Sequence, residues 1–158
     1  MSLTLTLRNR QRTRAVATHR LRRIIRCLLT DLLAIQTADL GVFIVAAPEM
    51  ARLNERFLGH AGTTDVITFD YADAAAVHSV PELHGEIFVC LDEAVTQARR
   101  FRTSWPTELV RYIVHGVLHL RGYTDQVPAA RRRMKREEDR LLRALARSFV
   151  LSRLASHR

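Results

Sequence analysis

The chain has 158 residues, the size of one ordinary domain, and 47% of them are apolar, which is enough for a hydrophobic core. Lys and Arg number 25 against 16 Asp and Glu, so the net charge is +9, and Lys135 is the only lysine. Because Arg binds phosphate through a planar fork of donors, this excess favours a polyanionic partner, nucleic acid before others. A coding bias that replaces Lys by Arg on solvated faces accounts equally well for many single arginines.

Cysteine usage and hydropathy exclude several other classes of protein. Cys27 and Cys90 are the only cysteines and form no Cys-x-x-Cys pair, so neither a disulfide framework nor a cysteine-based zinc site is expected. The N-terminal residues lack the apolar core of a signal peptide, and no apolar run approaches the roughly 20 residues of a membrane span. We therefore expect a cytoplasmic protein without membrane contact.

The spacing of apolar residues marks the elements of the first half of the chain. In chain order it predicts a strand over 3–7, a helix over about 16–35, a strand over 41–46, a helix over 49–57 and a strand over 64–71. Pro48 suits the first turn of the second helix. The first helix carries Arg22, Arg23 and Arg26 opposite its leucines, which we interpret as a solvated face rather than an RNA contact.

The second half of the chain predicts one further strand and three helices. After a loop over 72–83, the sequence favours a strand over 85–91, a helix over 92–101, a helix over 107–120 and a final helix that begins at Pro128. Asp92 is the expected N-cap of the first of these helices, and Ser104 and Pro106 mark the start of the second. Residues 1–158 are therefore expected to form a single α+β domain, with one mixed sheet of about four strands packed by about five helices.

Two histidines on the 107–120 helix carry the clearest chemical signal. His115 and His119 are four residues apart, so both imidazoles project from one helix face and can reach one ion at roughly 2.0–2.1 Å. Gly122 allows the chain to reverse in a left-handed conformation, and Asp125 follows as a third ligand. Three protein ligands leave a fourth position for a zinc-bound water, the pattern of a catalytic site. We therefore predict one bound Zn²⁺.

A histidine pair at this spacing is not always a zinc site. Such residues are often surface or satisfied core histidines, but this helix is otherwise apolar, and buried imidazoles without partners are costly. Two imidazoles and a carboxylate also suit divalent ions other than zinc. The spacing His-x-x-x-His-x-x-Gly-x-x-Asp also matches metzincin proteases, which need Glu after the first histidine as general base. Gly116 stands at that position here, which argues against a peptidase.

Residues 115–123, His-Gly-Val-Leu-His-Leu-Arg-Gly-Tyr, closely resemble the signature of the YbeY family, and Gly116 is what that family has. Leu53-Asn54 is similar to the Leu-Asn pair of the family, and residues 64–69 to its Thr-Asp-Val-Leu-Ser-Phe block. Residues 85–87, Gly-Glu-Ile, resemble its Gly-Asp-Ile strand, and Glu108 matches an acidic residue usual at that place. The resemblance spans roughly residues 42–125, in the order of the family.

The resemblance implies a metal-dependent endoribonuclease that cleaves single-stranded RNA, matures the 3′ end of small-subunit ribosomal RNA and serves in ribosome quality control. It also implies the small ribosomal subunit and ribosome-assembly proteins as partners. Arginines would hold the RNA backbone by charge. The RNA-binding candidates are Arg56, His60 and Arg121. The supporting candidates near the metal are Asp65, Glu86 and Thr68. The general base is not identified.

The chain departs from the family pattern in three places. The family motif usually ends Gly-Tyr-Asp-His, with that histidine as third zinc ligand, whereas Thr124 and Asp125 stand here. Leu58 occupies the position of a common loop arginine, and Thr68 replaces a serine. Two alternatives therefore stay open: a metal-stabilised ribosome-associated factor with weak or no nuclease activity, and a zinc hydrolase of another substrate, peptides included.

Overall fold

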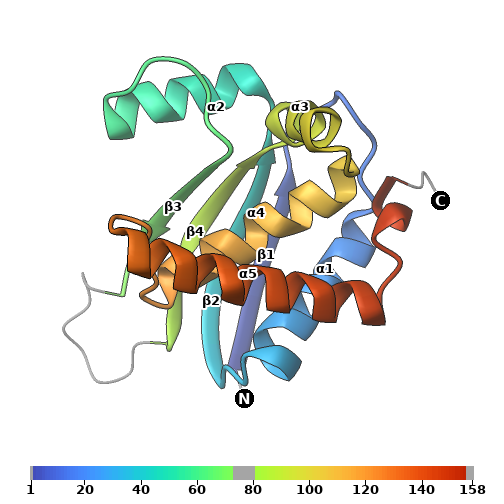
Figure 1. The fold of residues 1–158 in the computed structure, drawn as a ribbon, viewed down its shortest axis with the longest axis vertical. Helices are drawn as coiled ribbons and strands as arrows, with labels where there is room; N and C mark the ends of the chain where they lie inside the picture. The colour runs from blue at the N-terminus through green and yellow to red at the C-terminus, as the bar shows by residue number, and fades with distance from the viewer. Residues whose placement is uncertain (1, 73–80, 156–158) are drawn as a thin grey trace.

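A four-stranded mixed sheet forms the centre of the molecule (Figure 1). The computed structural model describes residues 2–72 and 81–155. The strand order is β1-β2-β4-β3, and the strands are β1 (Ser2–Asn9), β2 (Thr37–Val45), β3 (Val66–Asp70) and β4 (Leu83–Cys90). β1 and β4 each pair with β2 in parallel, whereas β3 pairs with β4 in antiparallel orientation. The predicted mixed sheet of an α+β fold is confirmed.

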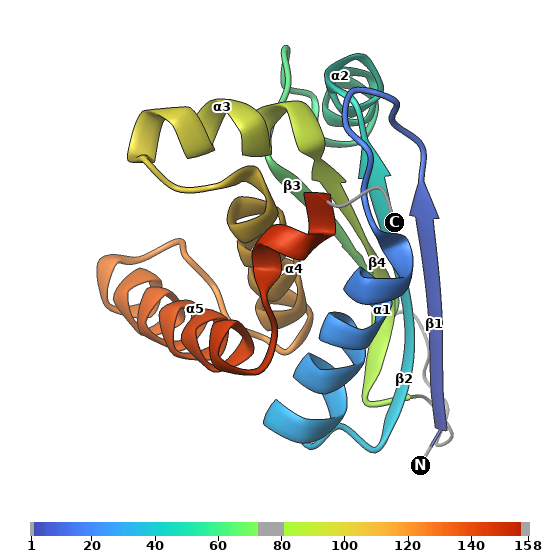
Figure 2. The same cartoon turned by 90° about the vertical axis from the view of Figure 1, so that its right-hand side faces the viewer.

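The described residues contain five α-helices, as expected from the sequence. They are α1 (Thr18–Arg26), α2 (Ala47–Leu53), α3 (Leu91–Phe101), α4 (Trp105–Leu120) and α5 (Pro128–Ser148). α1 continues into a π-helical turn, η1 (Cys27–Leu32), α2 continues into another, η2 (Asn54–Leu58), and a 3₁₀ turn, η3 (Leu151–Ala155), follows α5. Figure 2 shows α1 and α4 on one face of the sheet, with α5 outside them. Among these helices none combines the length and apolar character needed to span a membrane.

The helix α4 approaches the sheet closely because two glycines lie at the contact. A Cβ atom on Gly116 would meet Ile87 Cγ2 at 2.7 Å, and one on Gly85 would meet Leu120 Cδ2 at 2.8 Å. A larger residue at position 116 would push α4 away from β4, whereas one at position 85 would clash first with the backbone oxygen of Phe69 on β3, at 2.5 Å. This packing fixes α4 along β4. His115 and His119 are partly exposed and lie beside this contact, on the side of β3.

Two details of the sequence prediction are wrong. Asp92 does not cap its own helix, because α3 begins at Leu91 with Cys90 as N-cap. The Asp92 carboxylate instead accepts a 2.6 Å hydrogen bond from the backbone N–H of Ala47, in the first turn of α2. β2 begins at Thr37 rather than at residue 41, because Ala38 and the residues after it pair with both β1 and β4.

Other local predictions hold. Ser104 caps α4 by accepting from the N–H of Thr107 at 3.3 Å, and Gly122 has φ +98°, the conformation expected where the chain reverses. Pro48 lies in the first turn of α2. Of the predicted 72–83 loop, residues 73–80 lie outside the described residues, and Leu83 already belongs to β4.

Candidate metal centre

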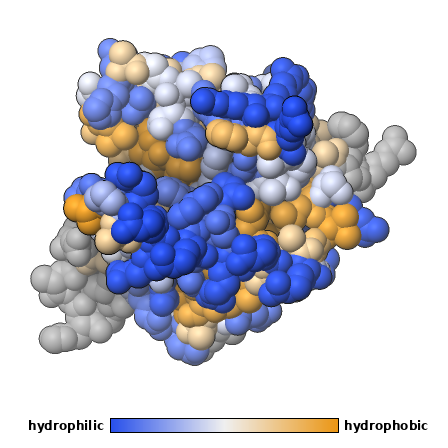
Figure 3. Space-filling view, viewed as in Figure 1, coloured by the Kyte–Doolittle hydropathy of each residue, from blue (hydrophilic) through white to orange (hydrophobic). Residues whose placement is uncertain are grey.

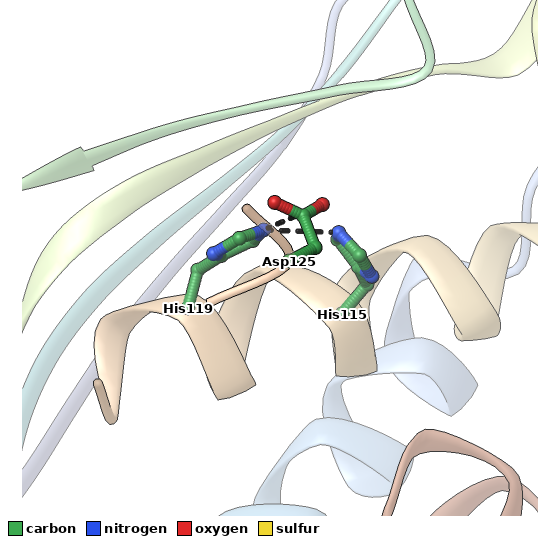
Figure 4. A group of neighbouring side chains, drawn as sticks. All are labelled: His115, His119 and Asp125. Carbon is green, nitrogen blue, oxygen red and sulfur yellow. Dashed lines mark hydrogen bonds and ion pairs between the residues drawn. The ribbon is translucent and has the colours of Figure 1, made fainter. Parts of the chain in front are cut away.

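Three predicted ligands converge beside α4 (Figure 4). His115 and His119 lie one turn apart on the helix, and their Nε2 atoms are 3.0 Å from each other. The chain turns back after Gly122 and brings Asp125 Oδ2 to 3.8 Å from His119 Nε2. One ligand atom from each residue lies within 4.8 Å of the others, so the group can hold a single metal ion.

The ring of His119 is fixed by its own loop. Its Nδ1 donates to the carbonyl oxygen of Tyr123 at 3.1 Å, and a carbonyl can only accept. Burial and the neighbouring His115 lower the pKa of His119, which favours the neutral ring. A neutral imidazole with hydrogen on Nδ1 presents a lone pair at Nε2, the form that binds a metal.

The ring of His115 is fixed by a carboxylate from α5. Its Nδ1 lies 2.8 Å from Glu138 Oε1, and Glu138 is only 5% exposed. Burial raises the pKa of Glu138, but hydrogen bonds from His115 and Arg111 outweigh it, so that the pKa falls to about 2. Glu138 is therefore an ionised acceptor and His115 Nδ1 is the donor, which turns His115 Nε2 towards His119.

The negative charge of Glu138 is balanced by two cations. Arg111 Nη1 and Lys135 Nζ lie 3.0 Å and 3.2 Å from Glu138 Oε2. Arg111 also binds Glu108 at 3.1 Å and Asp139 at 2.9 Å. Glu108 therefore holds Arg111 in place, and this ion network ties α5 to the histidine face of α4.

The geometry of the three side chains fits a metal ion. The two Nε2 atoms are 3.0 Å apart, and when both rings are neutral with hydrogen on Nδ1 their lone pairs point at one place, where the Asp125 carboxylate adds a negative charge and a cation is stabilised. Two imidazole nitrogens and one carboxylate oxygen match the ligand types of a three-residue zinc site. The hydrogen-bonded Nδ1 atoms supply the outer support that such ligands need.

The ligands open into a cleft of about 270 Å³. Its opposite wall is formed by η2 and the start of β3. The lining residues are Leu58, Asp65, Val66, Ile67, Thr68, His115, His119 and Asp125. Two of the three supporting candidates, Asp65 and Thr68, thus lie at the cleft.

Comparisons with known proteins identify the family of this chain. A family model described as Endoribonuclease YbeY matches residues 6–146. The chain belongs to the YbeY family. The Endoribonuclease YbeY of Chlorobium phaeovibrioides is 36% identical over 143 residues, which cover 90% of this chain and 91% of that protein. The protein of the same name from Chlorobium luteolum is 43% identical over 96 residues, 61% of this chain and 66% of its own.

A solved structure shares the fold. The solution structure of TM1509 from Thermotoga maritima superposes with a TM-score of 0.60 and covers 90% of this chain and 89% of its own. Its sequence identity is 21%, so the likeness concerns the fold alone.

The structure places the departures from the YbeY pattern at the cleft itself. Leu58, where the family commonly has arginine, is 48% exposed at the end of η2 and lines the cleft. Asp125 stands among the three ligand candidates, at the position where the family usually has histidine, and Thr68 also lines the cleft. Asp65 Oδ1 accepts from the N–H of Val66 at 2.8 Å and so orders the first residue of β3.

Four predicted residues do not line the cleft. Glu86 alternates along β4 with Gly85 and Ile87, which face α4, so it lies on the other face of the sheet. There Glu86 accepts a hydrogen bond from the Tyr71 hydroxyl, which raises the pKa of Tyr71 to about 12. The RNA-binding candidates Arg56, His60 and Arg121 are exposed outside the cleft.

Sequence reasoning missed Glu138, the residue that orients His115. A signal was available, because Glu138 falls within the apolar stripe of α5. The members of that stripe are Met134, Glu138, Leu141, Leu142 and Leu145. A carboxylate at such a position needs a buried partner.

Proposed function

We propose that this YbeY-family chain is an endoribonuclease that uses one zinc ion held by His115, His119 and Asp125. Its substrate is single-stranded RNA, and its role is maturation of the 3′ end of small-subunit ribosomal RNA and ribosome quality control in the cytoplasm, together with ribosome-assembly proteins. The observation that carries the proposal is the convergence of these three side chains in a cleft, in a chain that matches the Endoribonuclease YbeY model over residues 6–146.

Each residue of the centre has a distinct task. When bound, zinc supplies a Lewis acid and activates water near neutral pH. His115 and His119 present Nε2 to the ion, while Glu138 and the Tyr123 carbonyl hold their Nδ1 atoms. Asp125 is an anion at the position where the family usually has a neutral histidine. It therefore lowers the net charge of the centre and weakens its attraction for an oxyanion.

Asp65 and Thr68 support the centre from the opposite wall. Asp65 orders the start of β3 through its hydrogen bond from Val66 N–H, and Thr68 faces the same cleft. In this proposal both side chains lie on the wall that the RNA backbone passes. Glu86, on the far face of the sheet, has no part in this proposal.

A second candidate function rests on Leu58. A leucine where the family commonly has arginine removes a cation from the cleft wall, which favours a ribosome-associated factor with weak nuclease activity. The zinc-peptidase alternative is less favoured, because Gly116 has no side chain to act as general base, and a Cβ atom there would meet Ile87 Cγ2 at 2.7 Å.

The test combines zinc analysis with cleavage of single-stranded RNA. Wild type is expected to carry one zinc and to cleave, whereas His115→Ala and Asp125→Ala lose zinc and cleavage while staying folded. His19→Ala, an exposed histidine on α1, serves as the matched control and is expected to behave as wild type. RNA left intact by fully zinc-loaded wild type would overturn the proposal and favour the second candidate.

A further inference from the structure

The cleft itself lacks the cations that RNA binding requires. Among the described residues that line it there is no arginine or lysine. Neutralisation of phosphates supplies much of the affinity of proteins for nucleic acids. A cationic surface next to the cleft is therefore needed if RNA is to be held there.

The outer face of α5 carries such a surface. The buried face of this helix includes Glu138 and the leucines, and the opposite face carries arginines at spacings of four, four, three and four. We call this set the α5 arginine stripe: Arg132, Arg136, Arg140, Arg143 and Arg147. All five side chains are exposed. At about 1.5 Å of helix rise per residue the stripe is about 22 Å long, and Figure 3 shows hydrophilic residues gathered along the α5 face.

Most arginines of the stripe form no ion pair within the described residues. Over residues 2–72 and 81–155, only Arg140 of the stripe forms an ion pair, with Glu137. The arginines of α1 differ, because Arg22 donates to the carbonyl of Leu5 at 2.8 Å and Arg23 lies over the ring of Phe149. Like charges four residues apart destabilise a helix. An anion bound along the stripe would relieve this repulsion.

The stripe borders a hollow that also includes Tyr123, the residue whose carbonyl contacts His119. This hollow has a volume of about 390 Å³ and is lined by Tyr123, Arg133, Arg136, Glu137, Asp139, Arg140 and Arg143. Tyr123 is the residue whose carbonyl accepts from His119 Nδ1 at 3.1 Å. Tyr123 therefore links the hollow to the ligand candidate His119, and it places an aromatic ring among the arginines.

We infer that the α5 arginine stripe and its hollow bind the phosphate backbone of the single-stranded RNA whose neighbouring phosphate occupies the cleft. The inference rests on the proposed function for the identity of the substrate. Arginines contact phosphates without reading bases, and Tyr123 offers a stacking surface that accepts any base. Binding along the stripe is therefore independent of sequence and strongly dependent on salt.

The test measures binding of a fluorescently labelled oligouridine by the full chain in the presence of a chelator, so that no cleavage occurs. The variant Arg132→Gln/Arg136→Gln/Arg143→Gln removes three unpaired charges of the stripe. The slope of log affinity against log salt is expected to fall by about 2, since each phosphate contact on a single strand contributes about 0.7. Affinity at low salt is expected to weaken on the order of tenfold.

The matched control is Arg8→Gln/Arg12→Gln/Arg99→Gln, which removes the same charge at exposed positions outside the stripe and the hollow. It is expected to keep most of the affinity and of the salt slope. Equal losses in both triple variants would overturn the inference, because net charge alone would then explain binding. The proposed function fails separately, if zinc-loaded wild type binds oligouridine through the stripe but cleaves no RNA.

Discussion

The two walls of the cleft are built in different ways. On the α4 wall, His115 and His119 are each held by an acceptor behind them, and one of these acceptors, Glu138, lies in a buried ion network. On the η2–β3 wall, Leu58 is half exposed, and the Asp65 carboxylate is hydrogen-bonded to the N–H of the next residue. The side chains of the α4 wall are therefore already oriented to hold an ion. The opposite wall, by contrast, carries no arginine or lysine that could bind an anionic substrate.

The largest expected effect comes from breaking the support behind the α4 wall. Glu138→Ala removes one of the two buried carboxylates that pair with Arg111 and leaves His115 without its acceptor. We expect a loss of stability of about 3–5 kcal/mol and a fall in zinc affinity of about 10–100-fold. Chemical denaturation and a zinc competition titration measure the two effects.

The control for this change is Glu137→Ala, which removes the adjacent carboxylate on the same helix. Glu137 pairs with the exposed Arg140, so the expected cost is at most about 1 kcal/mol. Equal effects of the two substitutions on stability and zinc affinity would show that Glu138 does not support His115.

The second expected effect concerns the packing that sets the position of the α4 wall. Gly116→Ala brings a Cβ atom to within 2.7 Å of Ile87 Cγ2, so helix and strand must separate. We expect destabilisation of about 1–3 kcal/mol, measured by thermal unfolding. The double variant with Ile87→Ala is expected to cost less than the sum of the single variants. Strict additivity would contradict a direct clash.

A cation added to the η2–β3 wall is expected to strengthen substrate binding there. Leu58→Arg is expected to raise kcat/KM for single-stranded RNA on the order of tenfold, because a charged hydrogen bond to phosphate is worth about 1.5–3 kcal/mol. Zinc content should not change, since Leu58 is not among the ligand candidates. Leu58→Met controls for the substitution itself. Unchanged cleavage in Leu58→Arg would show that this position does not contact the substrate.

The smallest expected effect concerns the elements that carry the η2–β3 wall. Asp92→Ala removes the carboxylate that accepts from Ala47 N–H at the start of α2, with an expected cost of about 1 kcal/mol in unfolding experiments. Asp92→Asn keeps an oxygen acceptor and is expected to recover most of this loss. Identical stability of both variants and wild type would exclude a capping role.

The local parts of this structure could be predicted from the sequence. The spacing of His115 and His119 within one helix, the reversal at Gly122 and the return of Asp125 depend on residues close together in the chain. Helix geometry and the conformational freedom of glycine fix their relative positions. The strand and helix order likewise follows from apolar periodicity, which is a local property.

The parts that escaped prediction depend on contacts between distant segments. Glu138 lies 23 residues beyond His115, and only the packing of α5 on α4 brings them together. Asp92 caps a helix 45 residues earlier in the chain rather than its own. Side chains alternate along β4, so Glu86 points to the face of the sheet opposite to that of Gly85 and Ile87. The alternation alone does not tell which of the two faces α4 covers.

The most direct test of the proposed function is restoration of activity to protein stripped of metal with a chelator. We predict that cleavage of single-stranded RNA returns as zinc is added and saturates at one equivalent per chain, and that His119→Ala shows no such return. Full occupancy by zinc without RNA cleavage, or cleavage that survives complete removal of the metal, would contradict the account.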